Sequence, residues 1–155
     1  MTHTELMQRA IQLAADNVLH GGGPFGAVIA REGEIVAEGV NRVTASCDPT
    51  AHAEVQAIRA AGAALGTYDL TGCSIYASCE PCPMCLGAIY WARLSHLYFA
   101  AGQRDAAAAG FDDAAIYREF ALAPSLRRLP SQVLLPAEGL RPFRLWAAQA
   151  DKTPY

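Results

Sequence analysis

Three side chains in this sequence have the chemistry and the spacing of a zinc site. Cys82 and Cys85 form a C-x-x-C pair directly behind Pro81, and His52 stands well upstream of them. Zinc prefers imidazole nitrogen and thiolate sulfur as ligands, in a tetrahedral arrangement. Three protein ligands leave a fourth position for water, as in catalytic zinc sites. We therefore predict one zinc ion per subunit, held by His52, Cys82 and Cys85.

A carboxylate beside one of these residues adds a group for proton transfer. Glu54 lies two residues after His52, so on an ideal helix the two side chains would point about 200° apart. We therefore do not expect Glu54 to bind the same metal. Positioned acid–base groups typically contribute about 10²–10⁴-fold in rate. We predict that Glu54 is the catalytic acid and base.

The alternative for these motifs is a structural zinc site in a non-enzymatic binding module. Cys79 lies three residues before Cys82 and would complete a set of four protein ligands. A structural zinc site is closed in this way, whereas a catalytic site keeps one position for water. In that alternative, Glu54 would be an ordinary surface carboxylate. The number of protein ligands therefore discriminates between the two hypotheses.

The composition favours a folded domain with a small-molecule substrate. The chain has 155 residues, 52% of them hydrophobic and 17% charged, which is typical of one globular domain. Its net charge is −3 and Lys152 is its single lysine, so it lacks the basic excess of a nucleic-acid-binding protein. Its N-terminus lacks the apolar core of a signal peptide, and no apolar run is long enough to cross a membrane. We expect a cytoplasmic protein with reduced thiols that binds neither nucleic acid nor membrane.

The elements that must position the motifs follow from hydrophobic periodicity and turn signals. Helices are predicted at residues 4–19, 52–65, 83–93, 111–120 and 142–149, and strands at residues 25–30, 35–40, 73–77, 97–101 and 132–135. A hairpin followed by alternating helices and strands predicts an α/β fold, a three-layer α/β/α sandwich with a mixed central sheet. The helix at 83–93 is apolar on nearly all sides, so we expect it in the interior.

The predicted helix starts also suit metal binding. Pro81 and Pro83 favour a helix start next to the C-x-x-C pair, and a spacing of three places both thiols on roughly one helix face. The partial positive charge of a helix N-terminus lowers the pKa of a nearby thiol and so favours the thiolate. His52 would begin the preceding helix.

With these motifs, the chain resembles the cytidine-deaminase-like superfamily and, within it, the bacterial guanine deaminases. The pattern H-x-E…P-C-x-x-C is the signature of zinc nucleobase deaminases. The resemblance spans nearly the whole chain, in the blocks 24–29, 41, 48–55, 78–93, 110–113 and 155. The Gly-Phe-Asp-Asp block at 110–113 and the terminal tyrosine are particular to guanine deaminases, whereas residues 121–140 match nothing of use.

The resemblance implies hydrolytic deamination of guanine to xanthine and ammonia, in purine catabolism or salvage. It implies that Asn41 hydrogen-bonds the purine edge and that the backbone of Ala53 lies against the substrate. It also implies that Asp113 accepts from guanine N–H groups and that Tyr155 closes the pocket. The alternatives are that Asn41 shapes the turn after its strand, that Asp113 caps the helix near it, and that Tyr155 is a frayed terminus. Without the resemblance, the frayed terminus would be favoured for Tyr155.

The resemblance further implies one deaminase domain at residues 1–155 and a homodimer. In similar enzymes the C-terminal segment, here about residues 137–155, is exchanged between subunits, so Tyr155 would act in trans; the sequence leaves cis and trans open. Two other substrates use the same chemistry, namely tRNA adenosine and another small aminated base such as cytosine. Salt-sensitive tRNA binding would support the first of these.

Overall fold

A mixed four-stranded sheet forms the centre of the fold. The computed structural model describes residues 1–155, which divide into two compact units, Met1–Tyr117 and Arg118–Tyr155. In the first unit, the sheet consists of β1 (Gly26–Arg31), β2 (Glu34–Val40), β3 (Cys73–Cys79) and β4 (His96–Ala101), in the order β2-β1-β3-β4. Strand β1 is antiparallel to both of its neighbours, and β4 is parallel to β3.

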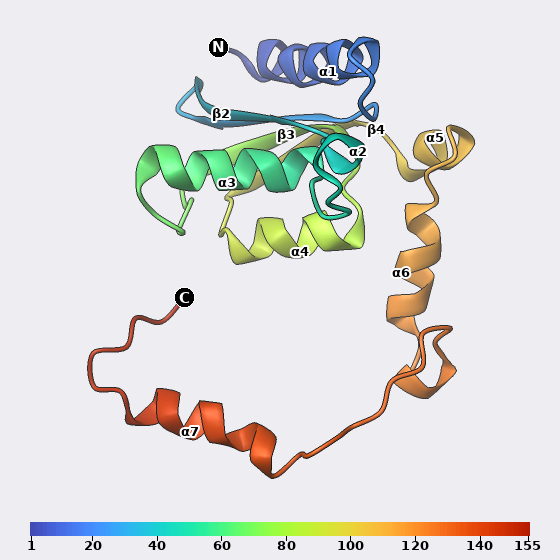
Figure 1. Ribbon diagram of the computed structural model, residues 1–155. Helices are drawn as coiled ribbons and strands as arrows, with labels where there is room; N and C mark the ends of the chain where they lie inside the picture. The colour runs from blue at the N-terminus through green and yellow to red at the C-terminus, as the bar shows by residue number, and fades with distance from the viewer. The chain divides into compact units, whose positions relative to one another are not determined.

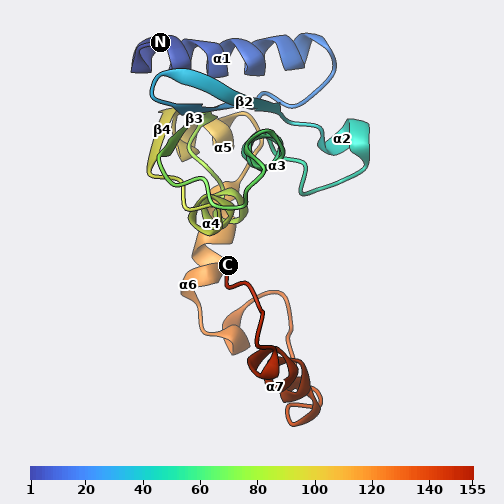
Figure 2. The ribbon, with the colours of Figure 1, turned by 90° about the vertical axis from the view of Figure 1, so that its left-hand side faces the viewer.

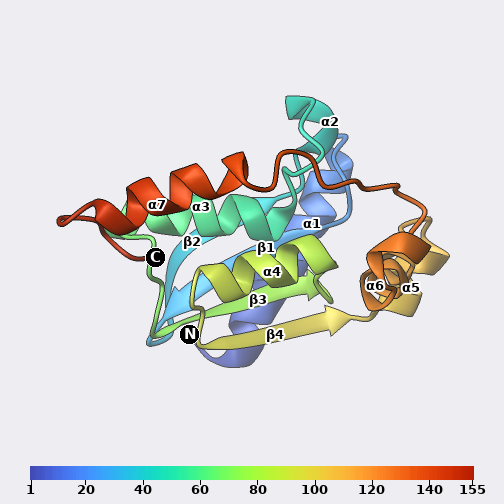
Figure 3. The ribbon, with the colours of Figure 1, turned by 90° about the horizontal axis from the view of Figure 1, so that it is seen from below.

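Helices cover both faces of this sheet. Helix α1 (His3–Leu19) covers one face, and α3 (Ala53–Leu65) and α4 (Pro83–Trp91) lie side by side on the other (Figures 1 and 2). The predicted three-layer α/β/α sandwich with a mixed sheet is confirmed. Seen from below, α3 and α4 cross the sheet in front of α1 (Figure 3). No helix combines the length and the apolar character that crossing a membrane requires.

Strand β1, which has a neighbour on each side, is buried on both faces, as its unbroken apolar sequence predicts. Ala27 and Ile29 face the α3 and α4 layer, where they pack with Ile75 of β3. Val28 and Ala30 face α1 and pack with the residues of that helix. Because both faces of β1 are covered, its register is strongly specified, since a slip of one residue would exchange the two faces.

Two strand glycines bring the helices close to the sheet. A Cβ at Gly26 would lie 2.4 Å from the carbonyl oxygen of Ala10 in α1. A Cβ at Gly39 would lie 2.2 Å from the carbonyl oxygen of Ala53 in α3. These separations are closer than any side chain allows, so the absence of a side chain sets the height of both helices above the sheet.

Several short helices connect or follow these layers. The first unit contains α2 (Val43–Ser46) and α5 (Gln103–Ala108), which the sequence did not predict, and α6 (Asp113–Ala121) runs across the boundary of the units. The second unit contains two 3₁₀ turns, Pro124–Leu126 and Glu138–Leu140, followed by α7 (Arg141–Ala148).

Two predictions about elements are wrong. Helix α4 is not interior on all sides: Pro83, Cys85 and Ile89 are buried, but Tyr90 and Trp91 are 77% and 67% exposed. A helix that rests on one sheet buries one face only, whatever the polarity of its other face. The segment 132–135 forms no strand, because it pairs with no sheet edge and its apolar side chains are exposed.

Candidate active site

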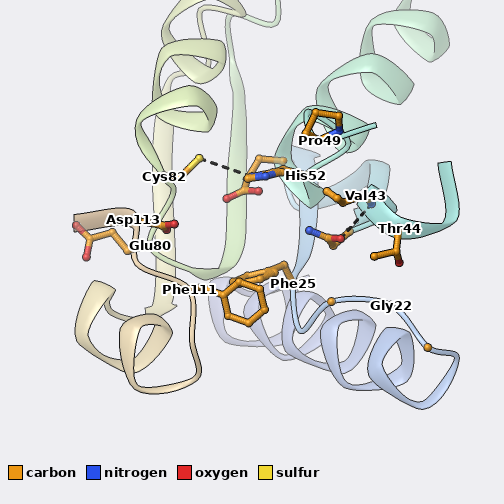
Figure 4. A pocket seen from close by; sticks show the side chains of 14 residues that line it. Gly22, Phe25, Val43, Thr44, Pro49, His52, Glu80, Cys82, Phe111 and Asp113 are labelled. Carbon is orange, nitrogen blue, oxygen red and sulfur yellow. Dashed lines mark hydrogen bonds between the residues drawn. The ribbon is translucent and has the colours of Figure 1, made fainter. Parts of the chain in front are cut away.

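Two helix starts carry the predicted metal ligands. His52 is the N-cap of α3 and Cys82 is the N-cap of α4, and both have extended backbone, with φ and ψ of −72° and 155° for His52 and −66° and 168° for Cys82. Pro83 follows Cys82 in the first helical turn, where a missing N–H costs nothing. The two side chains point toward one another across the gap between the helices (Figure 4).

The three donor atoms are close enough to share one metal ion. His52 Nδ1 lies 3.6 Å from Cys82 Sγ and 3.4 Å from Cys85 Sγ, and all three ligand atoms lie within 4.8 Å of one another. Zinc bonds of about 2.3 Å to sulfur and 2.0 Å to nitrogen in a tetrahedron place such atoms roughly 3.5–3.8 Å apart. The donor set therefore fits zinc in both chemistry and spacing.

The pKa values of the two thiols are shifted in opposite directions. The pKa of Cys82 is lowered to about 4 because its sulfur accepts hydrogen bonds from Cys85 and His52, despite partial burial. The pKa of Cys85 is raised because its proton is shared with the sulfur of Cys82 and because it is buried. Cys82 therefore favours the thiolate form that metal binding requires, and a metal ion held by both sulfurs would displace the proton of Cys85.

Cys79 does not join this group. Its Sγ donates to the carbonyl oxygen of Gly102 at 3.7 Å, and burial raises its pKa to about 11. The metal-binding group contains His52, Cys82 and Cys85 alone. The four-ligand structural site that Cys79 would complete is therefore not formed.

Glu54 lies beside the metal ligands in a buried position. Its side chain is 7% exposed, and its Oε2 accepts a hydrogen bond from Cys85 Sγ at 3.4 Å. Burial raises the pKa of this carboxyl group, which suits a group that must both take up and release a proton. The ideal-helix angle of about 200° does not apply to this pair, because His52 precedes the helix in extended backbone, and both side chains line the same cavity. Glu54 is nevertheless outside the group of three ligands.

A cavity of about 460 Å³ opens beside these groups and is lined by residues of the first unit. His52, Glu54 and Cys82 lie at one part of its wall. Phe25 and Phe111 form an apolar part, with their rings edge to face at 4.9 Å and 84° (Figure 4). No lysine or arginine lines the cavity. Its volume and its mainly apolar wall with a few polar groups are typical of small-molecule sites.

Two of the predicted substrate-binding residues line this cavity. The Oδ1 of Asn41 accepts a hydrogen bond from the backbone N–H of Val43 at 3.2 Å, so its Nδ2 remains as a donor. Asp113 also lines the cavity, and it is not the cap of α6, because Asp112 accepts the hydrogen bond from Ala115 N–H. Burial, with the nearby Cys82 thiolate, raises the pKa of Asp113.

The other two predicted residues have different positions. Ala53 is buried at the first turn of α3 between His52 and Glu54, where the first N–H groups of the helix have no acceptor within it. Tyr155 belongs to the second unit, where its ring meets Trp146 edge to face at 6.4 Å. The substrate contact predicted for Tyr155 stays a prediction.

Sequence reasoning assigned five of the fourteen lining residues to the site; Phe25, Phe111 and Glu80 are among those that it missed. Neither Phe25, at the start of a predicted strand, nor Phe111, two residues before Asp113, was assigned to the site. Glu80 lines the cavity while its carboxylate accepts from the backbone N–H and the side-chain amide of Gln103, each at 3.2 Å. Its position directly before the P-C-x-x-C motif was the available signal.

Comparison with known proteins agrees with this geometry. Residues 1–101 match the family model of the cytidine and deoxycytidylate deaminase zinc-binding region. The chain therefore belongs to this family of zinc-binding deaminases.

The chain is similar over its full length to a guanine deaminase and over about half its length to a tRNA-specific adenosine deaminase. The chain is 53% identical to the guanine deaminase of Bacillus subtilis over 156 residues, which covers all of both proteins. An X-ray structure of guanine deaminase from Bacillus subtilis matches with a TM-score of 0.97 and 52% identity, over 100% of this chain and 99% of that one. The guanine deaminase from Nitrosomonas europaea matches with a TM-score of 0.69 and 35% identity, over 72% of this chain and 65% of that one. The tRNA-specific adenosine deaminase of Agrobacterium fabrum is 45% identical over 78 residues, which is 50% of this chain and 51% of that protein.

Proposed function

We propose that the protein is a zinc-dependent hydrolase that deaminates guanine to xanthine and ammonia. The observation that carries this proposal is that one cavity is lined by His52 and Cys82 of the metal-binding group, by the buried Glu54, and by Asp113, whose carboxylate does not cap a helix. The full-length similarity to a guanine deaminase supports the same substrate.

The reaction replaces the exocyclic amine of guanine with oxygen from water. When bound, zinc lowers the pKa of water toward about 7 and so makes a nucleophile available at neutral pH. Glu54 takes a proton from the attacking water and passes it to ring N3, so that C2 gains a bond to oxygen. It then takes the second water proton and gives it to the amine, and the C2–N bond breaks as ammonia leaves. Burial raises the pKa of Glu54 above the usual carboxyl range, which makes it a better proton acceptor, and a pKa nearer the operating pH suits a group that must also return the proton.

Recognition of guanine rests on donors and acceptors placed around the cavity. The Asp113 carboxylate accepts from the N1–H and the exocyclic amine, and the free Nδ2 of Asn41 donates to an acceptor on the purine edge. The backbone at Ala53 lies against the substrate. A site that pairs such groups rejects bases lacking the complementary atoms by factors of about 10⁴–10⁵.

The test is ammonia release from the zinc-loaded protein, offered guanine, adenine, cytosine and guanosine in parallel. We expect release from guanine alone. Release from another base would retain the zinc chemistry and overturn the assignment of Asn41 and Asp113. Saturable, salt-sensitive deamination of tRNA with no release from guanine would favour the tRNA hypothesis, although the relatives with that activity match only part of the chain.

Replacement of Glu54 by Gln tests its assigned role. We expect turnover to fall by about 10²–10⁴-fold, because the amide retains the shape but not the proton transfer. Zinc content should stay at the wild-type level, because Glu54 is outside the ligand group. A variant with wild-type turnover would show that another group transfers the protons.

We also propose that residues 1–155 form one functional domain that acts as a homodimer in the cytoplasm, with about residues 137–155 exchanged between subunits. Two features support this. The apolar face of α4 is uncovered at Tyr90 and Trp91, and the second unit exposes large apolar side chains, among them Phe143 at 71% and Trp146 at 45%. Light scattering should give twice the chain mass, and cell fractionation should place the protein with the soluble cytoplasmic fraction.

Mixed dimers test whether Tyr155 acts in trans. Inactive Glu54→Ala subunits are refolded together with Tyr155→Ala subunits. If Tyr155 acts in trans, half of the sites in each mixed dimer contain both native residues and activity returns. If it acts in cis, every site lacks one of them and activity stays low.

A further inference from the structure

One side chain outside the cavity connects two segments of its wall. Asn17, near the end of α1, is not a lining residue. Its Nδ2 donates to the carbonyl oxygen of Gly23 at 2.8 Å and to the carbonyl oxygen of Asn41 at 2.9 Å. An amide nitrogen has two protons, so both are used to tie these two segments together.

The glycine loop closes directly over this amide. The backbone N–H of Gly22 donates to the backbone oxygen of Asn17 at 2.8 Å. A Cβ at Gly22 would lie 2.3 Å from Asn17 Nδ2, and a Cβ at Gly23 would lie 3.1 Å from the side chain of Asn41. A side chain at Gly22 would therefore overlap the Asn17 amide, whereas one at Gly23 would press against Asn41. Both glycines line the cavity, and Gly22 is labelled in Figure 4.

The same contact fixes Asn41. The backbone N–H of Asn41 donates to the carbonyl oxygen of Phe25 at 3.1 Å, its carbonyl oxygen accepts from Asn17, and its Oδ1 accepts from Val43. Three bonds hold the residue, and its Nδ2 alone is left to face a ligand. Loss of Asn17 would release the bridge between the carbonyl oxygens of Gly23 and Asn41, and would leave the backbone bond from Asn41 to Phe25 as the remaining link between the two segments.

We propose that Asn17 is a positioning residue for substrate binding, which holds the glycine loop and Asn41 together as one wall of the cavity. This inference rests on the proposed function. It predicts an effect on KM rather than on kcat, because the groups that transfer protons and bind metal lie on α3 and α4, which Asn17 does not contact through these bonds. A uniform binding interaction changes KM with kcat unaltered.

The sharpest variant is Asn17→Asp, which keeps the size of the side chain and replaces two donors by a carboxylate facing two carbonyl oxygens. Asn17→Ala removes the donors without adding charge, and it serves if the first variant fails to fold. Gln8→Glu is the matched control, because it makes the same amide-to-carboxylate change at an exposed site on α1. We expect both Asn17 variants to raise KM for guanine by about tenfold or more, with kcat within about twofold and zinc content unaltered; the control should match wild type.

Three results would overturn the inference: KM at the wild-type value in both Asn17 variants, a loss of kcat or zinc without a change in KM, or an equal rise of KM in the control. Failure of wild type to release ammonia from guanine would instead refute the proposed function. In that case, the connection between the two wall segments is still testable by hydrogen exchange, because the backbone amides of segments 21–25 and 41–44 should both exchange faster in the Asn17 variants. Unchanged exchange in either segment would refute the connection.

Discussion

The contact between Gly39 and α3 gives the most direct test of how the sheet positions the active site. In Gly39→Ala, the new Cβ would lie 2.2 Å from the carbonyl oxygen of Ala53 and 2.5 Å from the nitrogen of Ala57. Both partners are backbone atoms, so neither can rotate away, and the N-terminal turn of α3 must move by most of an ångström. Ala53 stands between His52 and Glu54, so this movement displaces a metal ligand and the catalytic carboxylate together.

The expected cost is at the upper end for an overpacked core, about 3 kcal/mol. A domain of this size loses about 2–4 °C in Tm per kcal/mol, so Tm should fall by about 6–12 °C. Because a misplacement of about 1 Å can cost roughly 10²-fold in rate, kcat/KM should fall as well. Thermal unfolding of the zinc-loaded protein and steady-state ammonia release measure the two effects.

Gly87→Ala is the matched control, because it makes the same substitution inside a helix with no atom within 4 Å of the new Cβ. There we expect a stabilisation of up to about 1 kcal/mol from the better helix propensity of alanine, so this variant is the control for the change in Tm. A Gly39→Ala protein with the Tm and kcat/KM of wild type would refute the reasoning, since α3 would then not rest on β2 as closely as described.

Other predictions concern contacts around the same framework. The Tyr117 hydroxyl donates to the carbonyl oxygen of Pro81 at 2.8 Å and so connects the helix that carries Asp113 to the metal-binding loop. Tyr117→Phe should lower the free energy of unfolding by about 1 kcal/mol in urea and raise KM. A wild-type KM would exclude a role of Tyr117 in placing Asp113. The Arg9 guanidinium donates to both carboxylate oxygens of Glu38, at 2.6 Å and 2.8 Å, and this hydrogen bonding lowers the pKa of Glu38. A double-mutant cycle of this partly exposed pair should give a coupling of about 0.5 kcal/mol at neutral pH. This stabilisation should be fully present above about pH 4.3 and should be lost as the pH falls through the lowered pKa of Glu38. A coupling that persists in strong acid would contradict the ion pair. Removal of zinc by a chelator should reversibly lower the free energy of unfolding by about 4 kcal/mol if free zinc had been at 1,000 times its Kd, and Tm should fall with it. An unaltered Tm in metal-free protein would show that the ion does not bind the folded state preferentially.

The parts of the site that could be predicted from the sequence are those with local causes. Cys82 and Cys85 share a helix start, and the two prolines around Cys82 mark that start in the sequence. The spacing of the thiols is therefore set within one turn of chain. In the same way, the unbroken apolar run of β1 predicts burial on both faces, because few other environments accept it.

The tertiary structure decided what depends on residues far apart in the chain. His52 and Glu54 face the same site because the helix starts after His52, and Asn17 acts on Asn41 across 24 residues of sequence. Neither contact has a spacing rule that a sequence shows. The apolar sequence of α4 similarly gave no sign that Tyr90 and Trp91 are exposed in the single chain. Hydrophobicity is a property of each residue, whereas burial depends on which other segment covers it, and only the folded arrangement determines that.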